Sequence, residues 1–313
     1  MRTRALGSTG LEVSELALGT WGLSGDGYGP VAESEQDAVI DRALALGVTL
    51  FETADSYTKG AMEQRLGRRL PKSGALVATK IGTGREDSPP RKRFEADFLK
   101  DSAERSRERL AREQIDVLLL HNPSAQTLAG GAIEPAMAAI VEAGIARTWG
   151  VSVSGEAAAG AAIACGAPVI QVPYNAFYRR DFDRIAVEAR EKKIGVLVRS
   201  VLAYGLLCGN WPTTKEFPPG DHRAERWNPD ELKRRIMQLN ALRPSVGGAL
   251  SSLRAVALRY VLAKELVASA VLGPRKGAQL DQLVRDVGTD DIAMEAFARS
   301  SLENRVMAAG VKT

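Results

Sequence analysis

Residues 48–57 read Val-Thr-Leu-Phe-Glu-Thr-Ala-Asp-Ser-Tyr, a short apolar run typical of a buried strand that leads to Tyr57. Two similar runs occur further along the chain, and they are followed directly by Lys80 and by His121. If these strands lie parallel in a barrel, their carboxyl ends bring the three side chains to one face. A tyrosine, a lysine and a histidine can together protonate a carbonyl oxygen while a hydride reaches the carbon.

Strand-like and helix-like segments alternate through most of the sequence without a break in composition. The expected strands are residues 16–19, 48–53, 75–80, 115–120, 146–151, 168–172, 194–199 and 266–272. The expected helices are residues 33–46, 62–70, 94–110, 133–142, 156–164, 182–192, 250–264 and 278–287. Eight strand–helix units in one chain favour an α/β fold, a (β/α)8 TIM barrel that spans residues 1–313 as a single domain.

A doubly wound sheet is the alternative α/β fold, but no GxGxxG pattern follows any expected strand. The alternation of side chains also fits a barrel. Glu52 shares a strand face with the apolar residue two positions earlier, and Lys80 and His121 each share one with the apolar residues two and four positions earlier. These faces are expected to point into the barrel, with the polar residues at its open end.

Further segments complete the predicted barrel. Residues 4–16, which include Gly7 and Gly10, are expected to form an N-terminal β-hairpin that closes the bottom. Two connections are long, residues 82–93 after the third strand and residues 208–228 after the seventh. Both belong to the C-terminal face of the barrel, where active sites lie, and loops of this length are usually functional or mobile.

The composition excludes several classes of protein. The net charge is +4, but basic residues are interspersed with acidic ones, so no nucleic-acid partner is expected. No apolar stretch is long enough to span a membrane, and the first residues lack the apolar core of a secretory signal. Cys165 and Cys208 are the only cysteines and have no metal-ligand spacing, which favours a reduced, cytoplasmic protein without a metal site.

Common catalytic motifs are also missing. The sequence contains no Gly-Lys dipeptide and therefore no Walker A loop, and its two histidines, His121 and His222, cannot form HExxH. Residues 150–154, Gly-Val-Ser-Val-Ser, lack the last glycine of a nucleophile elbow. A serine hydrolase is therefore disfavoured.

Residues 51–57, Phe-Glu-Thr-Ala-Asp-Ser-Tyr, resemble the F-D-T-A-x-x-Y signature of the aldo-keto reductases. Residues 78–80 resemble the strand that carries the catalytic lysine of that family, and residues 115–121 resemble the strand that ends in its catalytic histidine. The opening residues 6–14 match the usual start of the family, and the order of the segments agrees over nearly the whole chain. The resemblance implies a TIM barrel that reduces carbonyl compounds with NADPH.

The catalytic tetrad of the family is an aspartate, a tyrosine, a lysine and a histidine, which fall on Glu52, Tyr57, Lys80 and His121. The resemblance implies that Tyr57 is the general acid, that Lys80 lowers its pKa, and that Glu52 holds Lys80. His121 would bind the substrate carbonyl. Glu52 is a departure, because the family has an aspartate at this position.

The resemblance also implies a cofactor site for NADPH or NADP, in which Arg275 and Lys276 would bind the 2′-phosphate. The implied cofactor-binding residues are Thr20, Trp21, Ser152, Gln171, Arg199, Ser200, Leu202, Gly205, Arg275, Gln279 and Gln282. Three further departures lie in these segments. Val153 and Leu283 stand where the family usually has asparagines, and Arg199 stands where an aromatic ring usually stacks on the nicotinamide.

The leading hypothesis is an NADP-dependent oxidoreductase that reduces a small aldehyde, ketone or sugar to an alcohol. One alternative is an NADP-binding regulatory protein with little turnover, similar to the β subunits of potassium channels. Another is a Schiff-base aldolase in which Lys80 is the nucleophile. The sequence does not specify the substrate or whether the protein is a monomer or a small homo-oligomer.

Overall fold

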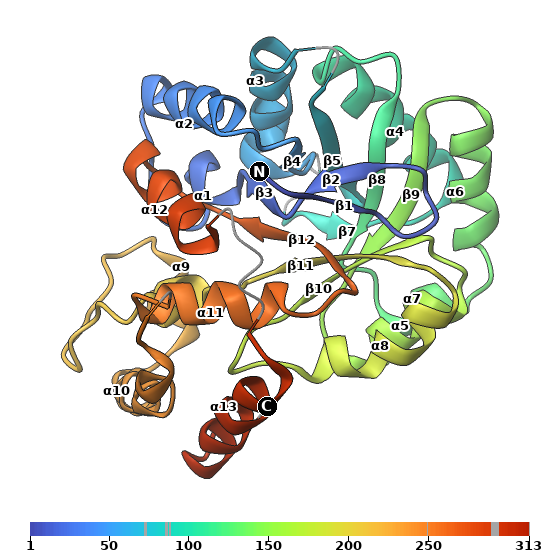
Figure 1. Cartoon of the computed structure of the whole chain (residues 1–313). Coiled ribbons are helices and arrows are strands. Elements are labelled where there is room, and N and C mark those ends of the chain that lie inside the picture. Colours follow the sequence, from blue (N-terminus) through green and yellow to red (C-terminus); the bar gives the residue numbers. More distant parts are fainter. Residues whose placement is uncertain (72–73, 85–86, 88, 249, 289–293, 313) are drawn as a thin grey trace.

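The computed structural model describes residues 1–71, 74–84, 87, 89–248, 250–288 and 294–312. Within them, eight parallel strands form a closed barrel with helices on its outside (Figure 1). The barrel strands are β3 Leu16–Gly19, β4 Leu50–Glu52, β5 Leu76–Ile81, β8 Ile115–His121, β9 Ala146–Ser152, β10 Val169–Pro173, β11 Gly195–Arg199 and β12 Val267–Leu272. Their order around the barrel follows the sequence, so the predicted (β/α)8 TIM barrel is confirmed.

Each barrel strand leads to an outer helix close to its predicted position. These helices are α2 Glu33–Ala45, α3 Ala61–Arg69, α4 Ala96–Arg109, α6 Ile133–Glu142, α7 Glu156–Ala164, α8 Arg180–Glu191, α11 Leu253–Leu262 and α12 Gly277–Val287. Helix α8 shows why they form: Phe182, Ile185 and Ala189 recur at spacings of three and four and are buried together. Helix α11 begins where the Ser252 side chain accepts a hydrogen bond from the Ala255 amide.

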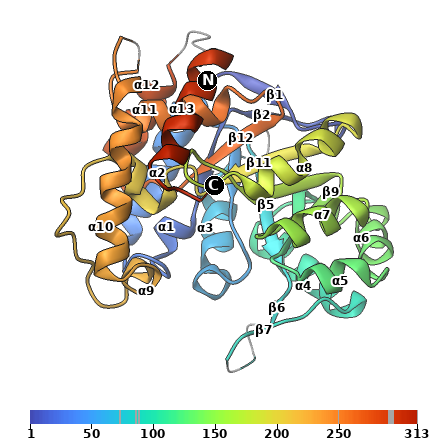
Figure 2. The same ribbon diagram turned by 90° about the horizontal axis from the view of Figure 1, so that it is seen from below.

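Other elements lie mainly in the connections. They are α1 Trp21–Ser24, η1 Tyr57–Gly60, β6 Thr83–Gly84, β7 Arg91–Lys92, α5 Ala125–Ala129, η2 Ala203–Cys208, α9 His222–Arg226, α10 Pro229–Gln238, η3 Leu239–Ala241, η4 Arg243–Ser245 and α13 Ala296–Ala308. Strands β6 and β7 project from the barrel, as Figure 2 shows. In the predicted long connection 82–93, residues 85–86 and 88 lie outside the described residues.

The predicted N-terminal hairpin consists of β1 Thr3–Ala5 and β2 Glu12–Ser14, which pair antiparallel. Leu6, Leu11 and Val13 are buried against the residues that fill the barrel interior. The hairpin therefore closes the amino-terminal end of the barrel, and only the carboxyl ends of the strands are left to form a site.

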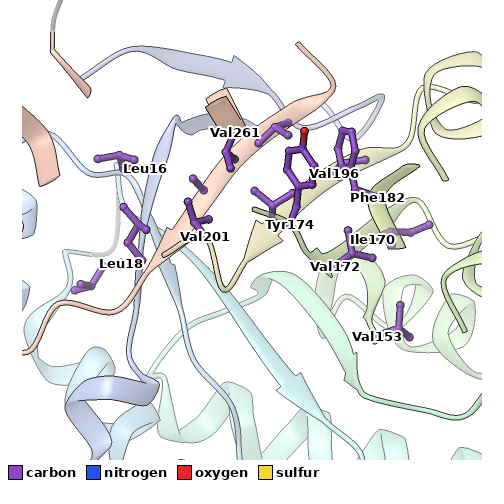
Figure 3. Packing of buried hydrophobic residues seen from close by; sticks show 14 of the residues in the cluster. Leu16, Leu18, Val153, Ile170, Val172, Tyr174, Phe182, Val196, Val201 and Val261 are labelled. Carbon is purple, nitrogen blue, oxygen red and sulfur yellow. The ribbon is translucent and has the colours of Figure 1, made fainter. Parts of the chain in front are cut away.

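The alternation predicted for the strands holds. Leu50, Ala78 and Leu119 pack inside the barrel, whereas their neighbours Phe51 and Leu118 belong to a second apolar layer between strands and helices. Figure 3 shows part of this outer layer, whose labelled members include Leu16, Ile170, Val172, Val196 and Val261.

Among the described residues, no helix is both long enough and apolar enough to cross a membrane.

Candidate active site

The carboxyl ends of the barrel strands surround a cavity of about 960 Å³. All four predicted catalytic residues line it. Glu52 and His121 are the last residues of β4 and β8, Lys80 lies near the end of β5, and Tyr57 begins η1. The parallel strands therefore bring together side chains that are far apart in the sequence.

Glu52 and Lys80 form a buried ion pair in which the Lys80 Nζ–Glu52 Oε1 distance is 2.5 Å. Glu52 is only 4% exposed and Lys80 only 2%. Lys80 also donates to the carbonyl oxygen of Thr53 at 2.7 Å. Burial lowers the pKa of Lys80, and the neighbouring Glu52 carboxylate opposes this effect. Glu52 thus reaches the predicted partner despite its extra methylene.

The Gln171 amide and the Ser152 hydroxyl extend this ion pair into a buried chain of hydrogen bonds. Gln171 Nε2 donates to Glu52 Oε1 at 3.1 Å, and Ser152 Oγ donates to Gln171 Oε1 at 2.7 Å. Lys80 and Gln171 therefore both donate to the Glu52 carboxylate, in an interior where an unpaired carboxylate would be destabilising.

Tyr57 lies close to both Lys80 and His121. The Lys80 ammonium is 4.8 Å from the centroid of the Tyr57 ring, and the Tyr57 and His121 ring centroids are 6.2 Å apart. Burial raises the pKa of Tyr57 well above its usual value of 10.0; the Glu52 charge acts in the same direction and Arg199 opposes it. Burial therefore outweighs the lowering of the Tyr57 pKa by Lys80 that the resemblance implies. Tyr57 keeps its proton at neutral pH.

His121 is neutral at neutral pH. Burial and the positive charges of Lys80, Lys92 and Arg199 lower its pKa well below 6.5. Its Nδ1 atom is buried and has no hydrogen-bond partner within the described part of the chain. A neutral imidazole has one donor and one acceptor nitrogen, and His121 lines the cavity.

The turn that carries Tyr57 has an unusual backbone. Thr58 and Lys59 follow Tyr57 with φ angles of 47° and 53°, in the left-handed region that side chains other than glycine rarely adopt. The Thr58 amide donates to Asp26 Oδ2 at 2.8 Å, and Thr58 Oγ1 donates to the Ser24 carbonyl at 3.0 Å. The segment after α1 thus holds the turn in place. Asp26 is not predicted from the sequence, since nothing local connects it with Tyr57.

The predicted cofactor residues fall into two groups. Nine of them line the cavity: Trp21, Ser152, Arg199, Ser200, Leu202, Gly205, Arg275, Gln279 and Gln282. Thr20 and Gln171 lie behind the cavity wall and are fully buried. Thr20 Oγ1 donates to Thr53 Oγ1 at 2.9 Å, and Gln171 Oε1 accepts the hydrogen bond from Ser152 Oγ.

Arg199 occupies the end of β11 beside the catalytic residues. Its Nη2 donates to the Val153 carbonyl at 3.1 Å and to Ser154 Oγ at 2.6 Å. Two departures noted in the sequence lie nearby. The Val153 backbone oxygen accepts this hydrogen bond from Arg199, and the Leu283 side chain gives the cavity an apolar surface. Both replace a polar amide that the resemblance predicts.

Arg275 has a different environment from the predicted one. Its Nη1 donates to the Tyr28 carbonyl at 3.0 Å, and its Nη2 donates to the carbonyls of Gly29 and Pro30 at 2.8 and 2.9 Å. The guanidinium therefore fastens residues 28–30 to the turn after β12. Lys276, the next residue, is exposed.

An aromatic cluster covers one side of the cavity. His222 packs against Trp21 and Tyr28, each at a ring-centroid distance of 4.7 Å, and against Tyr204 at 5.2 Å. The His222 amide donates to the Gly27 carbonyl at 2.9 Å, which attaches the long connection after β11 to the segment after α1. Isolated loop aromatics have no periodicity, so the sequence gives no signal for this cluster.

The chain belongs to the aldo/keto reductase family, because the model of that family matches residues 15–298. This agrees with the family expected from the sequence and places the protein in a family of carbonyl oxidoreductases.

Similar proteins include aldo-keto reductase YhdN of Bacillus subtilis (strain 168), which is 28% identical over 298 residues that cover 92% of this chain and 89% of that protein. L-galactose dehydrogenase of Arabidopsis thaliana is 29% identical, and the match covers 96% of this chain and 92% of that protein. The structure of the glycerol dehydrogenase AKR11B4 from Gluconobacter oxydans is similar with a TM-score of 0.82 and 26% identity. That match covers 99% of this chain and 96% of the other chain.

Proposed function

We propose that this protein is an NADPH-dependent oxidoreductase that reduces an aldehyde, ketone or sugar carbonyl to an alcohol. The observation that carries the proposal is the meeting of Tyr57, His121 and the Glu52–Lys80 pair at one cavity. The names of the similar proteins, an aldo-keto reductase and two dehydrogenases of polar alcohols or sugars, also favour it.

In the proposed reaction, a nicotinamide cofactor would, when bound, be the source of the hydride for the carbonyl carbon. Tyr57 is protonated at neutral pH and gives its hydroxyl proton to the oxygen, on which negative charge develops. Neutral His121 donates a hydrogen bond to the same oxygen and orients it. Lys80 and Arg199 are the nearby cations that would stabilise the phenolate left on Tyr57.

The residues around the cavity suit a dinucleotide cofactor. Ser152 would meet the nicotinamide amide, with Gln171 behind it, and the loop 200–205 would follow the pyrophosphate. Arg223, Arg226 and Arg254 add positive charge along the same cavity, which favours a phosphate-containing ligand. Cys165 and Cys208 are free thiols, which is in keeping with a cytoplasmic protein. The functional residues proposed here all belong to one barrel domain.

The Schiff-base aldolase hypothesis is less well supported. A nucleophilic amine must be unprotonated and accessible, but Lys80 donates to Glu52 and to the Thr53 carbonyl and is 2% exposed. Trapping with borohydride in the presence of a carbonyl substrate should therefore leave Lys80 unmodified.

The decisive experiment measures consumption of NADPH and of NADH with a panel of aldehydes, ketones and sugars. Tyr57→Phe is expected to reduce kcat by ~10²-fold or more, since general acids contribute ~10²–10⁴-fold, and to leave the Kd of NADPH nearly unchanged. Tyr178→Phe is the matched control, because the Tyr178 hydroxyl binds Asp181 outside the cavity. Tight NADPH binding without turnover of any compound would instead favour the regulatory alternative.

A further inference from the structure

The cavity carries many more positive than negative side chains. Its lysines and arginines are Lys80, Lys92, Arg199, Arg223, Arg226, Arg254 and Arg275, whereas its acidic residues are Asp26 and Glu52. A cleft lined with charges of one sign attracts ligands of the opposite sign. The question is which of these cations are available to a ligand.

Four of the cations already have strong partners within the protein. Lys80 pairs with Glu52, and Arg275 donates to three backbone carbonyls. Arg223 pairs with Asp221 at 2.6 Å, and Arg254 pairs with Asp286. Their hydrogen-bonding groups are therefore largely engaged within the protein, although their charges still act on the cavity.

Lys92, Arg199 and Arg226 differ from these, since none of them has a carboxylate partner in the described residues. Within the described part of the chain, Lys92 Nζ donates only to Thr83 Oγ1, at 3.0 Å, and Arg199 donates only through Nη2, to two neutral oxygens. Arg226 stacks on the Tyr204 ring, 3.8 Å from its centroid. The three cations keep donor capacity directed at the cavity that they line.

Lys92 and Arg199 both line the cavity near the proposed catalytic residues, one on a connection and the other on a barrel strand. Lys92 lies on β7, after the third barrel strand, whereas Arg199 ends β11, the seventh. The positive charges of both reach the same imidazole, that of His121. Arg226 belongs instead to the connection after β11, which we assign to the cofactor phosphates.

We propose, on the basis of the function proposed above, that the natural substrate is an anionic carbonyl compound, with a carboxylate or a phosphate group bound between Lys92 and Arg199. Its carbonyl oxygen then lies against Tyr57 and His121. The lysine donates as a point charge, and the arginine can bind a carboxylate or phosphate with two parallel hydrogen bonds. A neutral substrate of the same size would leave both cations without a counter-charge.

Two pairs of substrates test this inference with NADPH as the reductant. Butanal and 4-oxobutanoate differ by a carboxylate, and glyceraldehyde and glyceraldehyde 3-phosphate differ by a phosphate. In at least one pair, kcat/KM for the anionic member is expected to exceed that for the neutral one by roughly tenfold or more, because hydrogen bonds to charged groups contribute ~10–100-fold each. The pair with the larger ratio identifies the anion, and the ratio is expected to decrease as salt is added.

The variants Lys92→Gln and Arg199→Gln are each expected to reduce this anionic-to-neutral ratio about tenfold, chiefly through KM of the anionic member. The ratio cancels any loss that both substrates share, such as weaker cofactor binding or a poorer fold. Lys233→Gln is the matched control, since it removes one positive charge from the exposed part of α10, away from the cavity, and should leave the ratio unchanged.

A measurement without turnover completes the test. Succinate and inorganic phosphate, added to the protein with NADP bound, are expected to bind in calorimetry, more weakly to both variants. The inference is wrong if neither anion binds and the anionic-to-neutral ratio is near one, or if both variants keep the wild-type ratio. Absence of turnover of all four compounds, with anion binding that needs Lys92 and Arg199, would contradict the proposed function and support the anion site.

Discussion

Glu52 Oε1 lies 2.5 Å from Lys80 Nζ and also accepts a hydrogen bond from Gln171, so one carboxylate oxygen connects Lys80 with the side chain that binds Ser152. The longer side chain therefore does not break the ion pair that the family resemblance predicts. The Lys80 ammonium lies 4.8 Å from the centroid of the Tyr57 ring, and no hydrogen bond joins Lys80 to the Tyr57 hydroxyl among the described residues.

Substitution of Glu52 should separate its charge from its length. Glu52→Gln removes the negative charge that keeps the buried Lys80 protonated, so the pKa of Lys80 should fall further. We expect kcat to decrease by roughly tenfold or more and its alkaline limb to move to lower pH. Glu52→Asp keeps the charge and should remain folded and active. The test is the pH profile of kcat for the three proteins, and a Glu52→Gln profile equal to that of the wild type would exclude Glu52 from the tetrad.

Asp26 is expected to act through the backbone of the turn that carries Tyr57. Asp26→Ala removes the acceptor for the Thr58 amide and should lower kcat by roughly tenfold, since displacements of ~1 Å in a site can cost ~10²-fold. Thr58→Gly, introduced into Asp26→Ala, should restore much of the activity because glycine adopts a φ of 47° without strain. Asp26→Asn retains an oxygen acceptor and serves as the control. Equal kcat values for the single and double variants would show that Asp26 does not act through the turn.

His222 should make the protein less stable in acid. Burial and the positive charge of Arg226 lower its pKa to about 4 in the folded state, compared with 6.5 in an unfolded chain. The unfolded state therefore binds more protons between pH 6.5 and 4, and stability is lost as pH falls through this range. His222→Phe keeps an aromatic ring in the cluster but cannot titrate, so its Tm should fall less over the same range. Over this pH range the free energy of unfolding of the wild type is expected to fall more than that of the variant, by on the order of 1 kcal/mol. This figure is discounted for the partial exposure of His222 to solvent. Identical pH dependence of Tm in both proteins would refute this role.

Arg275 and Lys276 should contribute differently to cofactor binding. Because the Arg275 guanidinium holds residues 28–30, Arg275→Ala is expected to raise the Kd of NADPH and of NADH by similar factors. Lys276 is exposed beside the cavity, and Lys276→Ala should narrow the preference for NADPH over NADH. Fluorescence titration measures the Kd of NADPH and of NADH for each of the two variants. A selective loss of NADPH affinity in Arg275→Ala would show that the guanidinium leaves the carbonyls to bind the 2′-phosphate.

The barrel and the meeting of the four proposed catalytic residues could be predicted from the sequence because both depend on local patterns. Strand alternation sets the direction of Lys80 and His121, and the parallel order sets which ends meet. The contacts of Asp26, His222 and Arg275 could not be predicted in this way. Each depends on how one connection lies against another, and connections have no periodicity from which their partners can be identified.

The hairpin at the bottom of the barrel has a consequence for how the chain assembles. Arg4 donates to the carbonyls of Leu262 and Val267, which are 258 and 263 residues away in the sequence. During synthesis the first strands emerge long before these partners exist, so Leu6 and Leu11 must wait for the last strand to pair with β3. Closure of the ring and seating of the hairpin are then a single late event, and contacts of such large sequence separation make it slow. Until that event the interior of the barrel is open to water from below, and the incomplete chain is at its most vulnerable to aggregation and proteolysis.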